Sequence, residues 1–321
     1  MRNPHLQTIL PRFFKKQRQL DTIDETFELP DGDFVELCWS EKPQSGSNRP
    51  IVIVFHGLEG SIDSFYANGM MAAIKASGWI GVLMHFRGCG KLTNRHSRAY
   101  HSGETEDAND FIQSLKQNYP DSPLAAVGFS LGGNVLAKYL GEQGDNSLLD
   151  AGVIISAPLS LSVCAQHIGR RFSRVYQKYL LDMLKQSMLK KLDTLKDDFT
   201  LNITARDITG LKTLKAFDEL ITGPLHGFSS AEDYYQKASG RQFLKTITTP
   251  TLIIHAFDDP FMTKQVIPSP EELSPAISYE LSKRGGHVGF IHGKHPLRPQ
   301  FWLNQRAPEF INTIWQRKSK S

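Results

Sequence analysis

Short apolar runs alternate with longer amphipathic segments through much of the chain. The runs PIVIVFHG, WIGVLMHF, LAAVGF and DAGVIISAP each have the length of a single strand and show no polar face. The segments between them, at 64–78, 103–119 and 130–143, have the apolar spacing of helices. Strands that are apolar on both sides and separated by helices belong to a parallel sheet with both faces covered. The sequence therefore predicts an α/β fold, with a mostly parallel central sheet flanked by helices.

This alternation is preceded by a predicted hairpin and is interrupted once. TFELPDGDFVELCWS has two alternating runs around Asp31-Gly32, which is the pattern of a β-hairpin. From residue 159 to 245 the chain is helical and polar with no strong strand pattern. Strand patterns then resume in TPTLIIHAF and AISYELSK, before a final helix around FINTIWQ. We predict one core built from 1–158 and 246–321, with a helical cap inserted at 159–245.

The heptapeptide GFSLGGN lies where a predicted strand meets a predicted helix. Its first five residues, Gly128 to Gly132, fit the G-x-S-x-G pattern, in which a strained turn presents a serine hydroxyl at the start of a helix. The close backbone packing of such a turn leaves no room for side chains two positions before and after the serine. An ordinary glycine-rich turn is the alternative interpretation. The strand before the motif and the helix after it favour Ser130 as a nucleophile.

A serine nucleophile needs a general base and an acid that orients the base. TLIIHAFDDP places Asp258 and Asp259 after one late strand, and ELSKRGGHVGF places His287 after the next. Each residue alone is explained by a turn or a surface loop, but together they follow the chain order of an α/β-hydrolase triad. The pattern does not choose between the two aspartates.

The same reaction needs backbone donors for the oxyanion of the tetrahedral intermediate. One candidate is the N–H of Leu131, the residue after the nucleophile. The other is the N–H of Leu58 in HGLEGS, which follows an early strand. The alternative for HGLEGS is an ordinary glycine-containing loop.

Several longer motifs carry a more specific signal. NPHLQTILP, HGLEGS, HFRGCG, YHSGETED, GFSLGGN, DDPFM and GGHVGF extend over the chain from Asn3 to about Phe301. In these motifs the chain resembles the YheT-like branch of the α/β-hydrolase superfamily, the AB hydrolase 4 family. The resemblance implies a Ser-Asp-His serine esterase that acts on carboxylic esters, short-chain or glyceride-like. It places the nucleophile at Ser130, the base at His287 and the acid at Asp259.

Charge, cysteine content and hydropathy exclude several classes of protein. The chain has 37 Lys and Arg against 33 Asp and Glu, a net charge of +4, which is too small to indicate nucleic-acid binding without a clustered patch. The apolar runs are far shorter than the ~18 residues of a membrane span, and the first ten residues lack the apolar stretch of a signal peptide. Three scattered cysteines indicate no disulfide framework. We expect a cytoplasmic protein that needs no cofactor.

One further stretch, HFRGCGKLTNRHSRAYHSGETED, raises the question of a metal site. Its candidate ligands and charged neighbours are His85, Arg87, His96, His101, Glu104 and Asp107. Their spacing matches no standard zinc pattern. We favour a tight turn at RGCG with an ion-paired Arg87, and we predict no metal site.

The predicted cap contains a basic amphipathic helix in RRFSRVYQKYLLDMLKQSMLKKL. It could act as a lid over an apolar substrate or lie on a membrane surface. We favour a helix that packs its apolar stripe on the core and leaves its charges in solvent, which is compatible with a lid. The later segment FDELITGPLHGFSSAEDYY is predicted to be rich in loops near the pocket, and we assign no chemical role to Asp218, His226 or Asp233.

These patterns lead to one functional hypothesis and two alternatives. The hypothesis is a serine esterase that acts on a small-molecule ester. Acyl transfer to an acceptor other than water would use the same residues. A non-catalytic ligand-binding protein could share the scaffold, although such proteins usually lose a triad member, and this chain has candidates for all three. Neither acyl-chain length nor oligomeric state has a signature in the sequence.

Overall fold

The centre of the molecule is an eight-stranded, mostly parallel sheet. The computed structural model describes residues 3–13, 20–293 and 300–318, and the strand order in its main sheet is β1-β2-β4-β3-β5-β6-β7-β8. Pairing is antiparallel from β1 to β2 and from β2 to β4, and parallel from β4 through β8. The strands are β1 (Ile23–Glu28), β2 (Phe34–Trp39), β3 (Ile51–Phe55), β4 (Ile80–Met84), β5 (Leu124–Phe129), β6 (Ala151–Ile155), β7 (Thr251–Ala256) and β8 (Ile277–Ser282). The predicted hairpin and the predicted fold class are confirmed.

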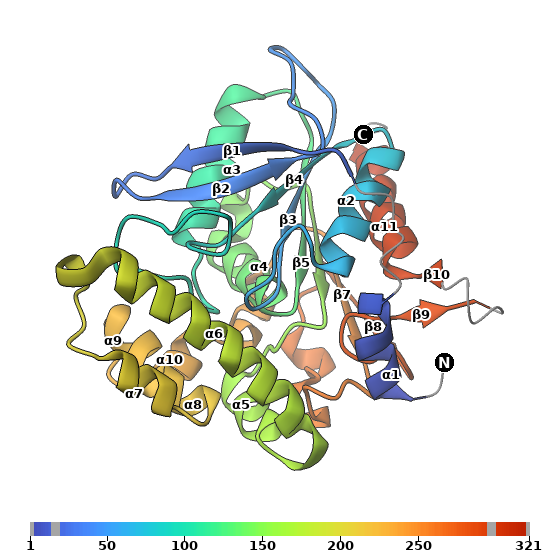
Figure 1. Ribbon diagram of the computed structural model, residues 1–321. Helices are drawn as coiled ribbons and strands as arrows, with labels where there is room; N and C mark the ends of the chain where they lie inside the picture. Colours follow the sequence, from blue (N-terminus) through green and yellow to red (C-terminus); the bar gives the residue numbers. More distant parts are fainter. Residues whose placement is uncertain (1–2, 14–19, 294–299, 319–321) are drawn as a thin grey trace.

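Helices cover both faces of this sheet (Figure 1). The side chains of β3 alternate between two buried clusters: Ile51 and Ile53 pack with α3 and α4, whereas Val52 and Val54 pack with α2 and α11. Every residue of β3 is buried, as expected for a strand covered on both sides. The four helices are α2 (Phe65–Ala76), α3 (Glu106–Asn118), α4 (Leu131–Gln143) and α11 (Leu303–Lys318).

Between β6 and β7 the chain forms a cap of helices, which Figure 1 shows gathered beside one end of the sheet. They have an apolar cluster of their own that includes Leu181, Met188 and Phe217. The segment that was predicted to be rich in loops is largely helical in the structure, so this prediction was wrong. Its helices are too short to show a helical period in the sequence. The cap helices are α5 (Leu161–Ile168), α6 (Arg174–Leu195), α7 (Ala205–Gly210), α8 (Leu214–Phe217), α9 (Gly223–Leu225) and α10 (Ala231–Ala238), with a π-helical turn η5 (Asp218–Thr222).

A short helix and a pair of short strands lie outside the main sheet and the cap. Helix α1 (Pro4–Ile9) begins with Asn3, whose side chain accepts hydrogen bonds from the N–H groups of His5 and Leu6. Strands β9 (Ile291–His292) and β10 (Gln300–Phe301) form a separate antiparallel pair. Across the described ranges, none of the helices combines the length and the apolar character that crossing a bilayer would require.

The basic side chains of α6 do not all lie in solvent, contrary to the expectation from the sequence. Lys191 is only 4% exposed, and its Nζ donates to the backbone carbonyls of His96 (3.1 Å), Ser97 (3.2 Å) and Arg98 (2.6 Å). Burial lowers the pKa of Lys191 to about 8. This ammonium group joins the cap to the loop that follows β4, because three carbonyls from that loop converge on it.

We predict that Lys191→Met lowers the free energy of unfolding by about 1–3 kcal/mol. The carbonyl of Ser97 loses its donor, and those of His96 and Arg98 keep only Asn94 Nδ2. The matched control is Lys190→Met, since Lys190 is the exposed neighbour on the same helix. Chemical denaturation of both variants measures the difference. Equal stability of the two variants would contradict a structural role for Lys191.

Candidate active site

The turn between β5 and α4 is strained and closely packed. Ser130 has φ 51° and ψ −116°, a conformation that residues other than glycine rarely adopt. A Cβ atom on Gly132 would lie 2.5 Å from the carbonyl oxygens of Phe55 and His56, and one on Gly128 would lie 2.4 Å from the carbonyl oxygen of Gly132. These are all backbone atoms, which cannot move aside as a flexible side chain can, so both positions need glycine. The turn has the geometry that the G-x-S-x-G pattern predicts.

The turn brings the Ser130 hydroxyl to an imidazole and a carboxylate. Ser130 Oγ lies 3.0 Å from His287 Nε2, and His287 Nδ1 lies 2.9 Å from Asp259 Oδ2. A carboxylate can only accept, so Nδ1 donates to Asp259, which leaves Nε2 to accept from the Ser130 hydroxyl. Asp259 and His287 are both buried, and the Phe261 ring stacks on the His287 ring with centroids 3.9 Å apart. Three residues predicted from separate motifs therefore form one hydrogen-bonded chain.

Asp258 has a different set of contacts from its neighbour. Its Oδ1 accepts hydrogen bonds from the N–H groups of Gly285 (2.8 Å) and Gly286 (3.0 Å), the two residues before His287. The sequence pattern left the two aspartates as alternatives. In the structure Asp259 contacts the imidazole, and Asp258 holds the backbone that leads to it.

The loop that carries His287 has an unusual backbone. Its φ values are positive at Gly286 (58°), Val288 (54°) and Phe290 (42°). For the β-branched Val288 and the aromatic Phe290 this conformation is costly. Such a loop keeps its shape only when the surrounding structure holds it.

Helix α1 supplies part of that support. Thr8 Oγ1 accepts a hydrogen bond from the N–H of His287 at 2.9 Å, across 279 residues of sequence. The Gln7 side chain accepts from the N–H of Ile291 (2.8 Å) and donates to its carbonyl (3.3 Å). Sequence reasoning missed both residues. NPHLQTILP marked this segment as a family motif, but nothing in the motif points to a loop near the other end of the chain.

The loop after β3, which carries Leu58, is fixed by a buried histidine. His56 Nδ1 donates to the carbonyl of Gly57 (2.7 Å), and its Nε2 accepts from the N–H of Phe86 (3.1 Å). Burial lowers the pKa of His56 to about 3, so the ring stays neutral. Leu58 and Leu131 both line the pocket at Ser130, and among the hydrogen bonds of the described residues none uses either backbone N–H.

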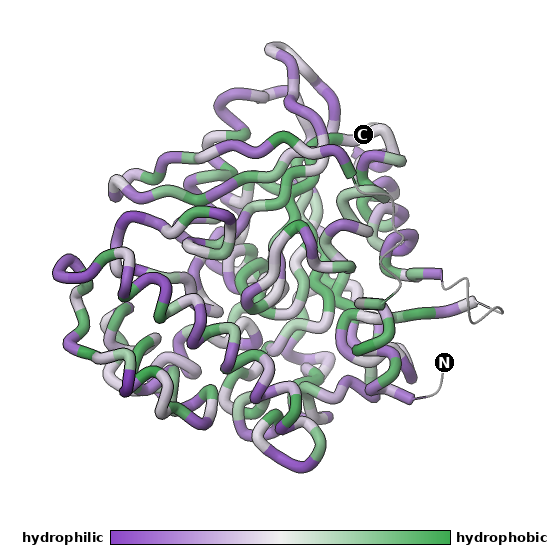
Figure 2. The backbone as a smooth tube through the Cα atoms, viewed as in Figure 1, coloured by the Kyte–Doolittle hydropathy of each residue, from purple (hydrophilic) through white to green (hydrophobic). Residues whose placement is uncertain are grey.

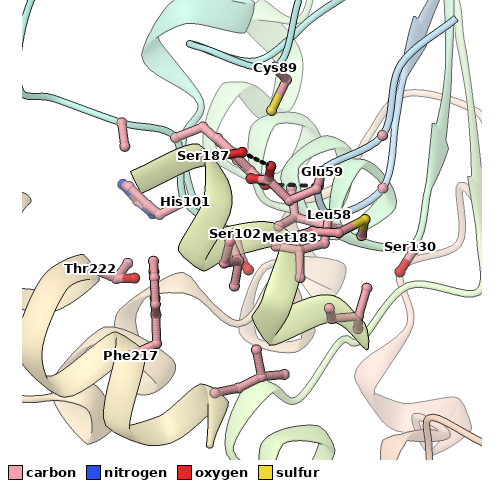
Figure 3. A pocket seen from close by; sticks show the side chains of 18 of the residues that line it. Leu58, Glu59, Cys89, His101, Ser102, Ser130, Met183, Ser187, Phe217 and Thr222 are labelled. Carbon is pink, nitrogen blue, oxygen red and sulfur yellow. Dashed lines mark hydrogen bonds between the residues drawn. The ribbon is translucent and has the colours of Figure 1, made fainter. Parts of the chain in front are cut away.

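Glu59 connects this loop to the cap. Its N–H donates to the Tyr100 hydroxyl (2.9 Å), which in turn donates to Glu59 Oε1 (2.7 Å). The hydroxyl of Ser187, on α6, donates to the other carboxylate oxygen (Figure 3). Burial raises the pKa of Glu59, and its backbone φ is 51°. The residue after Leu58 is thus held from both the core and the cap.

A pocket of about 720 Å³ extends from Ser130 between the core and the cap. Its lining includes the apolar side chains of Met183 from α6 and Phe217 from α8. Figure 3 shows His101 and Thr222 on the side of the pocket opposite Ser130. The pocket therefore has its reactive group at one side, and Figure 3 shows the apolar Phe217 beside Thr222 at the other.

The far side contains a cluster of possible metal ligands. Side-chain atoms of His101, Glu104 and His226 lie within 4.8 Å of one another. However, Nδ1 of His101 accepts the N–H of Gly103 at 3.1 Å, whereas a metal-bound imidazole carries a proton on its other nitrogen and donates from it. The His101 ring as it stands does not fit metal binding through Nε2.

Burial keeps the two histidines of this cluster neutral. It lowers the pKa of His101 to about 3 and that of His226 to about 2, so both rings are neutral.

The predicted ion pairing of Arg87 is confirmed, because Arg87 contacts Asp107 and Asp31, each at 2.7 Å.

Comparison with known proteins agrees with this architecture. A family model described as "alpha/beta hydrolase fold" matches residues 50–294. The chain is 49% identical to "Putative esterase YheT" from Escherichia coli (strain K12), over 99% of this chain and 92% of that protein. It is 28% identical to "Phospholipase ABHD3" from Mus musculus, over 96% of this chain and 75% of that protein. A solved structure of the Pyrococcus furiosus esterase Pf2001 has the same fold, with a TM-score of 0.58, 17% identity and coverage of 95% and 93%.

We predict that Gly132→Ala destabilises the protein by about 2 kcal/mol or more, because the new methyl group meets backbone carbonyls. Gly210→Ala is the control, since a Cβ atom there has nothing within 4 Å, and its stability is expected to change by at most about 1 kcal/mol. Thermal unfolding distinguishes the two variants. A Gly132→Ala variant as stable as Gly210→Ala would be inconsistent with the close packing described above.

Thr8→Val is expected to free the amide of His287, because it removes the acceptor and keeps the shape of the side chain. Hydrogen exchange should be faster in the loop around His287 by about tenfold, the equivalent of one hydrogen bond. Thr8→Ser retains the hydroxyl and should restore the slow exchange. Unchanged exchange in Thr8→Val would show that α1 does not hold this loop.

Proposed function

Because this chain belongs to the α/β-hydrolase family, we propose that it is a serine hydrolase that cleaves carboxylic esters, with Ser130, His287 and Asp259 as its catalytic triad. The observation that carries the proposal is the unbroken pair of contacts, 3.0 Å from Ser130 to His287 and 2.9 Å from His287 to Asp259. It is supported by the pocket that begins at the serine. The esterase-type names of the relatives agree with it.

In the proposed mechanism, His287 Nε2 takes the proton of Ser130 as its Oγ attacks the ester carbonyl. Asp259 stabilises the imidazolium that forms. The N–H groups of Leu58 and Leu131 donate to the oxyanion of the tetrahedral intermediate. The intermediate then expels the alcohol, which takes the proton from Nε2, and leaves an acyl group on Ser130. Water activated by His287 attacks this acyl-enzyme and releases the acid.

The pocket indicates the class of ester. Its apolar lining, which includes Met183 and Phe217, suits an aliphatic acyl chain. A relative at 28% identity is named a phospholipase. We therefore propose that the substrates are acyl esters, short-chain or glyceride-like. We also propose that the helices at 159–245 form a cap that encloses the acyl chain of the substrate.

Acyl transfer is the main alternative within the same chemistry. It would use the same triad and differ only in the nucleophile that reaches the acyl-enzyme. A ligand-binding protein without catalysis is the alternative outside enzymes. The hydrogen bond from Ser130 to His287 favours an enzyme, because it provides the base that activates the hydroxyl.

Ser130→Ala is expected to abolish hydrolysis of a p-nitrophenyl ester that the wild-type protein cleaves. It should also abolish labelling by a fluorophosphonate probe, because the nucleophilic oxygen is absent. Circular dichroism of the variant checks that it is folded. Labelling of wild type without hydrolysis, together with acyl transfer to an added alcohol, would favour the transferase. Hydrolysis that survives in Ser130→Ala would falsify the proposed function.

The two aspartates should differ in their effects on activity. Asp259→Asn replaces a carboxylate, which only accepts, with an amide whose NH2 group can donate to Nδ1 and stabilise the wrong His287 tautomer, and we expect kcat to fall by about 10⁴-fold. Asp258→Asn keeps an oxygen that can accept from Gly285 and Gly286, so kcat should fall by less than about tenfold. Steady-state kinetics of the pair measures this contrast. The reverse order would assign the acid to Asp258.

A further inference from the structure

A group of apolar side chains stands exposed where α1 meets the beginning of α6. Leu6, Phe172, Val175 and Tyr179 are 45%, 54%, 56% and 44% exposed, and we refer to these four residues as the α1–α6 patch. The two helices are in contact at this point. The His5 ring lies 4.4 Å from the Phe172 ring, and His5 Nδ1 is 2.9 Å from the Tyr176 hydroxyl.

The four side chains of the patch each leave about half of their surface in solvent. Tyr176 and Gln177, between Val175 and Tyr179, are buried. Phe172, Val175 and Tyr179 recur at intervals of three and four residues, so they share one side of the helix. That side is next to Tyr176, whose ring lies 6.2 Å from the Phe172 ring. Sequence reasoning grouped all of them into one packing stripe. The structure divides that stripe into a buried side and a side left in solvent, where apolar groups are unfavourable.

Basic residues lie beside this patch in the sequence. Residues 166–181 contain no Asp or Glu, and their four basic residues, Arg170, Arg171, Arg174 and Lys178, are all exposed. Lys178 pairs with Asp182 at 2.6 Å, so the three arginines carry the positive charge of this segment. An apolar patch beside arginines complements a surface that is negatively charged outside and apolar beneath.

The patch also adjoins the pocket. Tyr179 is both 44% exposed and part of the pocket lining, and Thr8 of α1 lines the pocket as well. A surface docked on the α1–α6 patch would therefore lie beside the cavity that holds Ser130. In Figure 2 the β1–β2 hairpin lies at the end of the molecule away from α5 and the beginning of α6, so docking would leave that end in solvent.

We propose that the α1–α6 patch docks on the surface of an anionic phospholipid bilayer, with its apolar side chains among the headgroups and its basic side chains beside the lipid phosphates. Apolar contact supplies affinity, and the basic residues select anionic over neutral lipid. Docking of this kind requires no membrane span. It is independent of the catalytic step.

The test is sedimentation of the full chain with lipid vesicles. Wild type should sediment with vesicles of equal phosphatidylcholine and phosphatidylglycerol, more weakly with phosphatidylcholine alone, and less as salt is raised. Phe172→Ser/Val175→Ser should lower the apparent affinity for the anionic vesicles by about tenfold or more, because two exposed apolar groups are lost. Arg170→Gln/Arg171→Gln should lower it by about tenfold on anionic vesicles and leave binding to phosphatidylcholine unchanged.

Two controls separate this surface from other causes. Ile23→Ser replaces a side chain of similar exposure, 47%, on β1 and should bind as wild type does. Ser130→Ala should also bind as wild type does, so the result does not depend on the proposed activity. Thermal unfolding checks that each variant is folded.

Three outcomes would overturn the proposal. The first is wild type that stays in solution with anionic vesicles. The second is a Phe172→Ser/Val175→Ser variant that binds as tightly as wild type. The third is a wild-type dimer in size-exclusion chromatography that these substitutions convert to monomer, because a second copy of the chain would then cover the patch.

Discussion

The hydrogen bond between Ser130 and His287 is the contact on which the arrangement of the site depends. It joins residues 157 positions apart, and each partner stands on a strained backbone. Ser130 lies in the turn from β5 to α4. This turn packs closely against the backbone carbonyls of Phe55 and His56, and it fits there only because Gly132 has no side chain. The backbone N–H of His287 donates to Thr8 of α1, and the N–H of Gly285 in the same loop donates to Asp258. A 3.0 Å contact therefore depends on four separate parts of the chain.

The cap is coupled to the core by polar groups that are buried between them. Lys191 donates to three carbonyls of the loop after β4, and Ser187 donates to Glu59 beside Leu58. Both residues belong to α6, so the position of one helix sets the wall of the pocket and the support of the loop that carries Leu58. The beginning of the same helix carries the exposed apolar patch. Helix α6 thus links the surface of the molecule to its pocket.

Prediction from sequence was accurate where a local pattern carried the information. The strands of the parallel sheet and the serine turn each lie within one stretch of apolar or glycine spacing, and the structure has them where the pattern predicts. Asp258 and Asp259 marked the limit of that reasoning. Both follow the same strand, and which of them meets His287 depends on the direction in which each side chain leaves the end of β7. Only the family resemblance had chosen Asp259.

The sequence by itself determined the α/β class, the turn that holds Ser130 and the order of the residues proposed for catalysis, because hydrophobic periodicity and glycine positions act within a few residues. The tertiary structure alone decided that Thr8 supports His287, that Glu59 joins the loop after β3 to the cap, and that Lys191 is buried while Phe172 is exposed. These are contacts between segments far apart in the chain. Their partners are selected by how helices and sheet pack, and no local pattern records that choice.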